Sequence, residues 1–594
     1  MSHSFHIPVL GLGYSIDTPL KVAKFGISSV VSIVDDELIE RMRKFHLEQN
    51  NQEYKAIKKT DSDYRAKRIT GYLNLLNNLV NKQIAILKEQ DFEEGTDLTQ
   101  YFNLLPNSSA LKKQYSEMLN ESDLKKKIQL QNQLRDELNP GAIEVNIMAK
   151  VDKINFAKNG DSLGDTFTDA LSALRGFADS DLHSAIILSA GMNPRLYSYL
   201  TEFKDFKSTD SVAKKKVILK VSDFRSAFIQ AKFLAKKGIW VHEFRVESGL
   251  NCGGHAFATE GYLLGPILEE FKERRSEMIA ELYLLYKSAL QENGYTVTLP
   301  PTRITVQGGI GNHEENNFLQ QHYQLDGTGW GSPFLLVPEA TNVDNDTLTS
   351  LKTADAADFY VSGASPLGVP FNDFRKSTSE RQRLERIAKG KPGSPCIKKY
   401  LVSNTEFTEV PICTASRKYQ NLKIKELKAK EISAEEYTAQ YDKIVEKACL
   451  CEGLTTSVYI KNDMLEAKEN SAVSICPGPN TAYFKNVYTL EEMVKHIYGR
   501  INLLEGVIRP HMYINELKLY IDYFKKDVEA NLNEINIKNT KRLERFKDQL
   551  IKGIEYYQNL LPELQKQKSL VYQKMENELQ DFRSLLHKIN IPSI

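Results

Sequence analysis

Eight short runs rich in β-branched and other apolar residues recur along the first 345 or so residues, and a segment with helical periodicity follows each of them. The runs are residues 9–13, 28–34, 143–148, 185–189, 217–221, 239–246, 303–308 and 326–332. This alternation is typical of a parallel sheet with crossover helices. Eight strands in strict alternation close more readily into a barrel than into an open sheet, so the pattern predicts an α/β fold, a (β/α)8 TIM barrel. A doubly wound sheet is the alternative.

The length of 594 residues exceeds what one hydrophobic core normally organises, so additions to the barrel are expected. We assign residues 1–34 and 141–345 to the barrel. The polar, Leu-rich stretch 35–140 predicts a helical insertion. Residues 346–488, with Pro/Gly-punctuated loops, predict a cysteine-containing lid or cluster region, and residues 489–594 predict a mostly helical C-terminal extension.

Charge and hydropathy exclude several classes of partner. The 78 basic and 77 acidic residues nearly cancel, so no global field attracts nucleic acid or an anionic membrane. No apolar run approaches the roughly 18 residues of a membrane span, and the first residues do not read as a secretory signal. We therefore expect a cytoplasmic protein without nucleic-acid or membrane partners, whose C-terminal helices pack on the barrel or on a second subunit of a homo-oligomer.

Glycine clusters end the seventh and eighth runs. Gly308 and Gly309 follow the seventh, and Gly331 precedes Ser332 after the eighth. Glycines let backbone N–H groups approach an anion closely, and a serine hydroxyl can add a donor. Because barrel enzymes often bind phosphate at the ends of strands seven and eight, these four residues predict a phosphate cup.

The sixth run ends in RVESGLNCGGHAF, which places Cys252 and His255 at the predicted barrel mouth. An imidazole titrates near neutrality and can act as a general acid or base. His255 is therefore the leading catalytic candidate, with a turn-forming role as the alternative. Cys252 reads better as a small packed side chain than as a nucleophile.

At this point a family resemblance becomes clear, and it covers most of residues 6–345 except the insertion. The chain resembles the nitronate monooxygenases, formerly called 2-nitropropane dioxygenases, whose superfamily includes the flavin-type enoyl-acyl carrier protein reductases. The segments that carry the resemblance are IPVLGLGYS, IEVNIM, VILKVSDFRSAFIQAKFLAKKGIWVHEFRVESGLNCGGHAF, ITVQGGIG and DGTGWGSPFLLVPEA.

The resemblance implies an FMN cofactor across the barrel mouth, with His255 as the base. It implies three sets of flavin-binding residues: Gly11, Leu12 and Gly13 bordering the ring; Asn146, Lys220 and Gly254 contacting the ring or lining its pocket; and Gly308, Gly309, Gly331 and Ser332 holding the phosphate. The family pattern is not kept at Leu12 and at Asn251-Cys252, which lie on the substrate side. The resemblance therefore supports the cofactor more strongly than it supports the reaction.

The cysteines form a second pattern. Cys449 and Cys451 form a Cys-x-Cys pair, and Cys476 lies in a Cys-Pro turn, which resembles iron–sulfur ligation. With Cys413 as the fourth ligand, ahead of Cys396, these residues could hold one 4Fe–4S cluster. Four-thiolate zinc and ordinary free thiols are the alternatives.

Together these features predict an FMN-dependent oxidoreductase of the nitronate monooxygenase or enoyl reductase type. Its substrate would be a small activated acid or an acyl thioester, reacting by hydride or electron transfer. Electrons could come through the iron–sulfur cluster, from an electron-donor protein or from NAD(P)H. The alternatives are a nitronate-type monooxygenase that uses oxygen, and a non-catalytic barrel that binds a protein partner.

Overall fold

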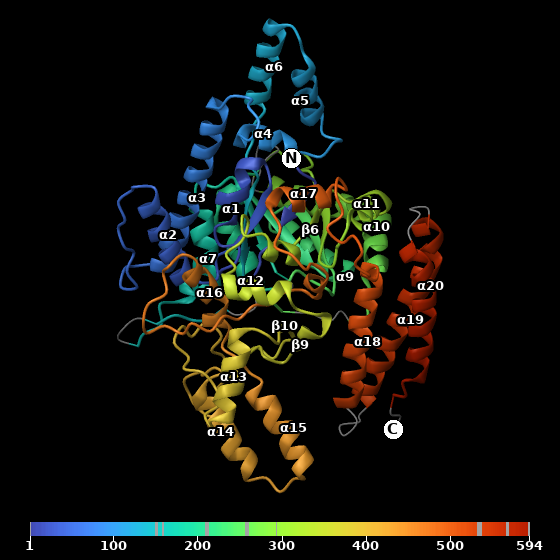
Figure 1. Ribbon diagram of the computed structural model, residues 1–594. Coiled ribbons are helices and arrows are strands. Elements are labelled where there is room, and N and C mark those ends of the chain that lie inside the picture. The colour runs from blue at the N-terminus through green and yellow to red at the C-terminus, as the bar shows by residue number, and fades with distance from the viewer. Residues whose placement is uncertain are drawn as a thin grey trace.

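A computed structural model describes residues 2–148, 152–156, 160–189, 191–207, 213–255, 260–292, 294–530, 537–565 and 570–591 (Figure 1). Eight parallel strands form a closed barrel in which each strand pairs with the next, and β1 pairs with β8. The strands are β1 Phe5–Ile7, β2 Ser28–Ser32, β3 Ile143–Ile147, β4 Ser184–Leu188, β5 Lys215–Val221, β6 Val241–Glu247, β7 Arg303–Gln307 and β8 Gly327–Gly329. The predicted (β/α)8 barrel is confirmed.

The first strand lies earlier than the sequence pattern indicates. Residues 9–13 were expected to be a strand, and that expectation is wrong. Pro8, which has no N–H to donate to a ladder, follows β1 directly, and Gly11 has a positive φ of 59°. Residues 9–13 therefore form the loop at the carboxyl end of β1, where a site can be built.

Helices cover the outside of the barrel. Those between strands or directly after β8 are α1 Thr18–Val22, α7 Asp169–Ala178, α8 Pro194–Tyr199, α9 Phe224–Ala235, α10 Leu264–Gln291, α11 His313–His322 and α12 Asn345–Lys352. Between β2 and β3 come five more: α2 Asp36–Gln49, α3 Tyr64–Glu89, α4 Asp97–Leu104, α5 Ala110–Asn120 and α6 Leu124–Asp136.

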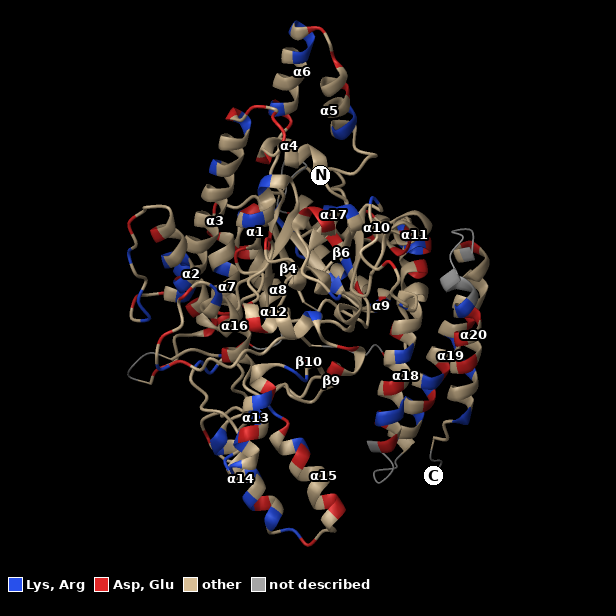
Figure 2. Ribbon diagram, viewed as in Figure 1, with Lys and Arg blue, Asp and Glu red and all other residues tan. Residues whose placement is uncertain are grey.

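The chain after α12 covers the barrel mouth and one flank. Its elements are β9 Phe359–Ser362, β10 Phe371–Phe374, α13 Thr378–Ala388, α14 Arg417–Lys428, α15 Ala434–Val445, α16 Leu450–Lys461, α17 Leu490–Ile497, α18 Met512–Ala530, α19 Ile537–Gln565 and α20 Leu570–Lys588. Figure 1 shows α5 and α6 projecting from one end of the barrel, α13–α15 from the opposite end, and α18–α20 standing beside it. Lys, Arg, Asp and Glu gather on these projecting helices (Figure 2). No helix in the described ranges is long and apolar enough to cross a membrane.

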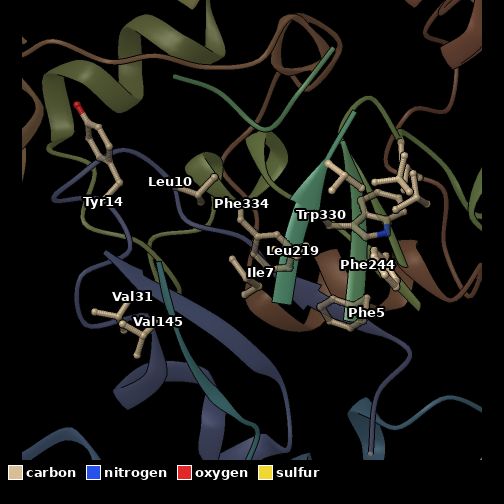
Figure 3. Close-up of a cluster of buried hydrophobic side chains, with 14 of the residues drawn as sticks. Phe5, Ile7, Leu10, Tyr14, Val31, Val145, Leu219, Phe244, Trp330 and Phe334 are labelled. Atoms are coloured by element: carbon tan, nitrogen blue, oxygen red, sulfur yellow. The ribbon is translucent and has the colours of Figure 1, made fainter. Parts of the chain in front are cut away.

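One continuous hydrophobic core joins the strands to the surrounding helices (Figure 3). Phe5, Leu219, Phe244 and Trp330 are nearly inaccessible to solvent. Burying each such side chain contributes about 1.5–3 kcal/mol, so the core fixes the strands that carry the site residues.

The barrel interior is partly charged. Arg245 is 2% exposed, and its Nη2 lies 2.9 Å from Glu144 Oε2 and 2.7 Å from Glu243 Oε1. Buried charges are tolerated when they are paired in this way. The paired side chains fill the interior, so the carboxyl ends of the strands remain as the place for a ligand.

Candidate active site

A cavity of about 200 Å³ lies at the carboxyl ends of β1–β6, and we call it the mouth cavity. Its floor comes from the strand ends and the loops after them, and its roof comes from the β9–β10 hairpin, residues 400–401, α16 and Cys476. The residues predicted on the flavin-ring side that line it are Gly11, Leu12, Asn146, Lys220, Gly254 and His255. The structure thus brings into one cavity six residues from four separate segments of the chain.

His255 is held between the barrel mouth and the roof. Its Nε2 lies 2.7 Å from Ser365 Oγ, and its backbone forms an antiparallel bridge with Phe371. The imidazole packs edge-on against the Phe371 ring, with 5.3 Å between centroids. Asn251 Nδ2 donates to the His255 carbonyl at 2.9 Å. The side chain that the sequence marks as an acid or base therefore has a fixed orientation at the cavity wall.

Lys220 points into the cavity from the inner face of β5. Its Nζ lies 2.9 Å from Glu247 Oε2 at the end of β6, and both side chains are mostly buried. Glu247 Oε1 accepts a hydrogen bond of 2.7 Å from Gln307 Nε2. Because Glu247 neutralises the ammonium, Lys220 offers a positioned donor rather than an uncompensated charge.

The cavity glycines differ in what surrounds them. A Cβ at Gly11 would lie 2.8 Å from the Tyr14 ring, whereas a Cβ at Gly254 would meet nothing within 4 Å. Gly254 therefore faces open space, where a ligand can approach the backbone. Gly13 does not line the cavity. Its N–H donates to the Leu454 carbonyl at 3.1 Å, so this glycine serves the close approach of α16.

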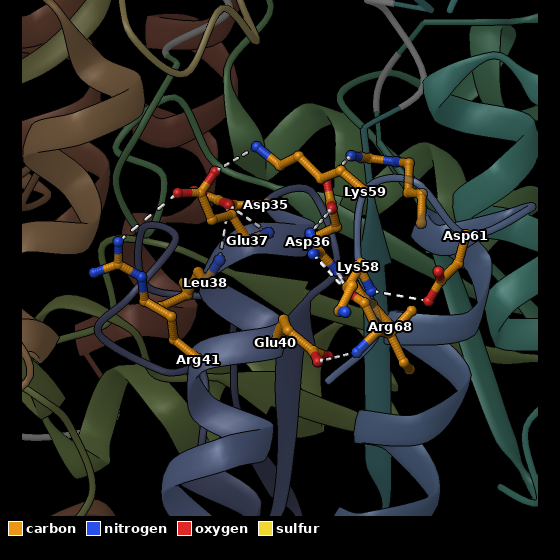
Figure 4. A network of polar contacts seen from close by, with 12 residues as sticks. Asp35, Asp36, Glu37, Leu38, Glu40, Arg41, Lys58, Lys59, Asp61 and Arg68 are labelled. Carbon is orange, nitrogen blue, oxygen red and sulfur yellow. Dashed lines mark hydrogen bonds and ion pairs between the residues drawn. The ribbon is translucent and has the colours of Figure 1, made fainter. Parts of the chain in front are cut away.

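Ion pairs and hydrogen bonds connect the roof to the barrel, and Figure 4 shows the polar network on the barrel side, around Asp35, Asp36 and Arg68. Asp35 Oδ2, at the start of α2, lies 2.7 Å from Lys398 Nζ, and Asp35 Oδ1 accepts a hydrogen bond of 3.0 Å from Tyr400 Oη. The adjacent Asp36 binds Arg68 Nη1 of α3 at 2.9 Å. Burial opposes ionisation of Asp35, yet the Lys398 charge lowers its pKa. The network thereby places the Tyr400 ring at the cavity wall.

The glycines of the predicted phosphate cup are covered by protein. A Cβ at Gly308, Gly309 or Gly331 would lie 2.5–2.9 Å from atoms of residues 250–252. Ser332 is 4% exposed, and its Oγ accepts a hydrogen bond of 2.8 Å from the Gly478 N–H. None of these four residues lines the mouth cavity. These four residues thus pack against the loop after β6 and against Gly478, and their role in holding a phosphate stays a prediction.

The cysteines do not gather into the predicted ligand set. Cys396 and Cys413 are hydrogen-bonded to each other, which lowers the pKa of Cys396 to about 7. Burial raises the pKa of Cys449 to about 11 and that of Cys451 to about 12. Among the described residues, no three His, Cys, Asp or Glu side chains are placed to hold a metal. The structure thus lends no support to an iron–sulfur or zinc site at Cys413, Cys449, Cys451 and Cys476.

Cys476 has a different neighbourhood. Its carbonyl accepts a hydrogen bond of 3.3 Å from the Gly254 N–H, and the residue lines the mouth cavity together with Cys451. Burial raises the pKa of Cys476 to about 12, so the thiol stays protonated at neutral pH. Cys252 is buried behind Gly331, as expected of a packed side chain.

Several residues of the site cannot be recognised from the sequence patterns described above. Ser365, Phe371 and Tyr400 come from the roof, and each meets the barrel only through the tertiary fold. Glu247 directly follows a predicted strand and lies two residues after Arg245. Because side chains two residues apart in a strand point to the same face, the sequence could have placed Glu247 on the inner face.

A larger cleft of about 480 Å³ lies between α18 and the β9–β10 hairpin. Val369 borders both this cleft and the mouth cavity, but none of the predicted site residues lines the cleft. The larger volume of the cleft therefore does not make it the candidate active site. We assign the site to the mouth cavity because several polar groups converge there.

Comparison with known proteins finds structural similarity only, and it is low. No family model matches the chain, and no curated protein matches it. Among solved structures, a mutant of FabK from Thermotoga maritima is similar at 12% identity and a TM-score of 0.30, covering 67% of this chain and 83% of that one. Nitroalkane oxidase from Streptomyces ansochromogenes is similar at 10% identity and a TM-score of 0.33, covering 84% of this chain and 95% of that one. Likeness at this level carries no argument about cofactor or reaction.

Proposed function

We propose that the chain is a flavin-dependent oxidoreductase that works at the mouth cavity. The observation that carries the proposal is the convergence of Gly11, Leu12, Asn146, Lys220, Gly254 and His255 on that cavity. Apolar walls with a few positioned polar groups suit a planar ring. The residues present fit the ring of a flavin, but the covered cup does not fit its phosphate.

A bound flavin would supply hydride or electron transfer. The protein residues would do the rest. His255 Nε2, oriented by Ser365, would hold or deliver a proton at the substrate, and Asn146 and Lys220 would hydrogen-bond the ring. Leu367, Val369 and Phe371 would exclude water from the apolar face. The small cavity favours a small activated acid, or the acyl end of a thioester, as substrate.

The test is reconstitution. The purified full-length protein is mixed with flavin, freed of excess by gel filtration, and examined by absorption spectroscopy. One flavin per chain with a shifted visible spectrum would support the proposal. So would anaerobic reduction of that flavin by an alkyl nitronate, or reoxidation of the reduced flavin by an enoyl thioester. A protein that retains no flavin would refute it and favour a non-catalytic barrel.

A further inference from the structure

The segment 476–480 packs on the loops after β7 and β8, where barrel enzymes often bind phosphate. It starts at the mouth cavity, where Cys476 is a lining residue, and it forms an antiparallel bridge between Pro477 and Gly253. At the next residue, the Gly478 N–H donates to Ser332 Oγ at 2.8 Å. Asn480 Nδ2 donates to the Ile310 carbonyl at 2.8 Å. The segment thus runs from the cavity across the loops that follow β7 and β8.

Arg509 locks this segment from behind. Its Nε donates to Asn480 Oδ1 at 2.9 Å, its Nη2 donates to the Gly309 carbonyl at 2.7 Å, and its Nη1 lies 2.6 Å from Glu315 Oε1. A Cβ at Gly311 would lie 2.4 Å from the guanidinium carbon. Arg509 is 7% exposed, and its charge is already neutralised by Glu315. Arg509 therefore holds the segment 476–480 in place, and its charge is not available to bind an anionic ligand.

The segment is a packed part of the structure. Cys476, Pro477, Gly478 and Asn480 are all buried. Moving them would break the hydrogen bonds above and leave buried donors without acceptors, at about 1–3 kcal/mol for each unsatisfied group. A side chain at position 478 would not fit without a shift of its neighbours, because a Cβ there would lie 2.6 Å from Ser332 Oγ.

The mouth cavity offers no replacement for the cup. Among its described lining residues, Lys220 is the one lysine or arginine, and it is paired with Glu247 at 2.9 Å. A phosphate monoester carries a charge of about −1.5 to −2 at neutral pH. Because burying that charge without a partner is unfavourable, the phosphate of a bound FMN would stay in solvent and would add no affinity.

We propose that this barrel holds its flavin by the ring and ribityl chain alone, and that it binds riboflavin as tightly as FMN because residues 476–480 and Arg509 occupy the phosphate cup. The inference rests on the proposed function, since it needs a flavin in the mouth cavity. It assigns to Gly478, Asn480 and Arg509 the role of setting which form of the cofactor is accepted.

The test compares the two flavins on the flavin-free, full-length protein by quenching of flavin fluorescence, with calorimetry as a second measurement. Dissociation constants for riboflavin and FMN within about threefold of each other are expected, since a threefold ratio is well under the 1.4 kcal/mol that makes a factor of ten. FMN bound tenfold or more tightly than riboflavin would overturn the inference and leave the proposed function standing. Binding of neither flavin would overturn both.

Two further measurements keep the result independent of folding defects. The ratio of the two constants should not change between about 50 mM and 500 mM salt, because salt screens an exposed phosphate contact. Ser332→Ala, checked by circular dichroism, should leave the ratio unchanged as well. A selective loss of FMN affinity in Ser332→Ala, or at high salt, would show that the phosphate uses the cup and would overturn the inference.

Discussion

The Nε2 atom of His255 lies 2.7 Å from Oγ of Ser365, a residue 110 positions later in the chain. His255 belongs to the loop after β6, and Ser365 belongs to the connection between β9 and β10 and is fully buried. The contact joins the barrel to its roof. The imidazole is therefore oriented by a part of the chain outside the barrel, and both residues should affect proton transfer.

His255→Ala should lower turnover by about two to four orders of magnitude while flavin binding is retained, because it removes the acid or base but no ring contact from the strands. Ser365→Ala should lower kcat less and should shift the pH profile of kcat/KM, since the hydroxyl only positions the imidazole. Steady-state kinetics with flavin content measured in parallel would check both. Unchanged turnover in His255→Ala would remove this residue from the mechanism.

Gly254→Ala should weaken flavin binding, because its Cβ would project into open space at the cavity wall. Gly390→Ala is the matched control: both glycines have positive φ, 79° and 65°, and neither Cβ would meet an atom within 4 Å, but Gly390 is remote from the cavity. Both variants should lose about 1 kcal/mol of stability from backbone strain. Flavin titration separates them, and equal affinities would contradict a ligand at Gly254.

Glu247→Gln should destabilise the protein by about 1–3 kcal/mol, because it leaves the mostly buried Lys220 ammonium without its counter-charge. The control is Glu53→Gln, which breaks an exposed pair with Lys55 at 3.6 Å and should cost about 0–1 kcal/mol. Urea unfolding at neutral pH measures both. Similar small losses in the two variants would mean that Lys220 does not depend on Glu247.

Burial raises the pKa of Asp373 in β10 from its ordinary value of 3.8 to about 6. A raised pKa means that the folded state binds the proton more tightly, so its contribution to stability is complete below about pH 4 and is lost as the pH rises through 6. Asp373→Asn should therefore raise the free energy of unfolding at pH 8 by about 1–3 kcal/mol and change it little at pH 4. Denaturant unfolding at the two pH values tests the sign, and a variant less stable than wild type at pH 8 would contradict the burial effect.

Cys396 should be the first cysteine to react with iodoacetamide at pH 8. Its pKa of about 7 leaves most of it as thiolate, whereas the pKa values of Cys451 and Cys476 are near 12. Pulsed alkylation followed by peptide mass spectrometry gives the order. Protection of Cys396 together with Cys413, Cys449 and Cys451, reversed by a chelator, would instead indicate a bound metal.

The barrel could be predicted from local sequence patterns, because each buried strand appears in the sequence as a short apolar run. Seven of the eight expected runs overlap a strand, and the exception, residues 9–13, shows that a Pro next to a short apolar run can move a boundary. The convergence of predicted residues on the mouth cavity could be expected for the same reason. Asn146, Lys220, Gly254 and His255 stand at or near strand ends, and a closed parallel barrel brings all strand ends to one face.

What the sequence by itself determined is thus the barrel, its open face and the side chains projecting there, since a two-residue period and a strand end are local properties. Only the tertiary structure decided that Gly478 packs on Ser332 and that Ser365 contacts the His255 imidazole. Among the described residues it likewise places no three His, Cys, Asp or Glu side chains to hold a metal. These outcomes depend on where residues 346–509 pack on the barrel. That packing is set by the complementarity of surfaces more than a hundred residues apart in the chain, which no local pattern records.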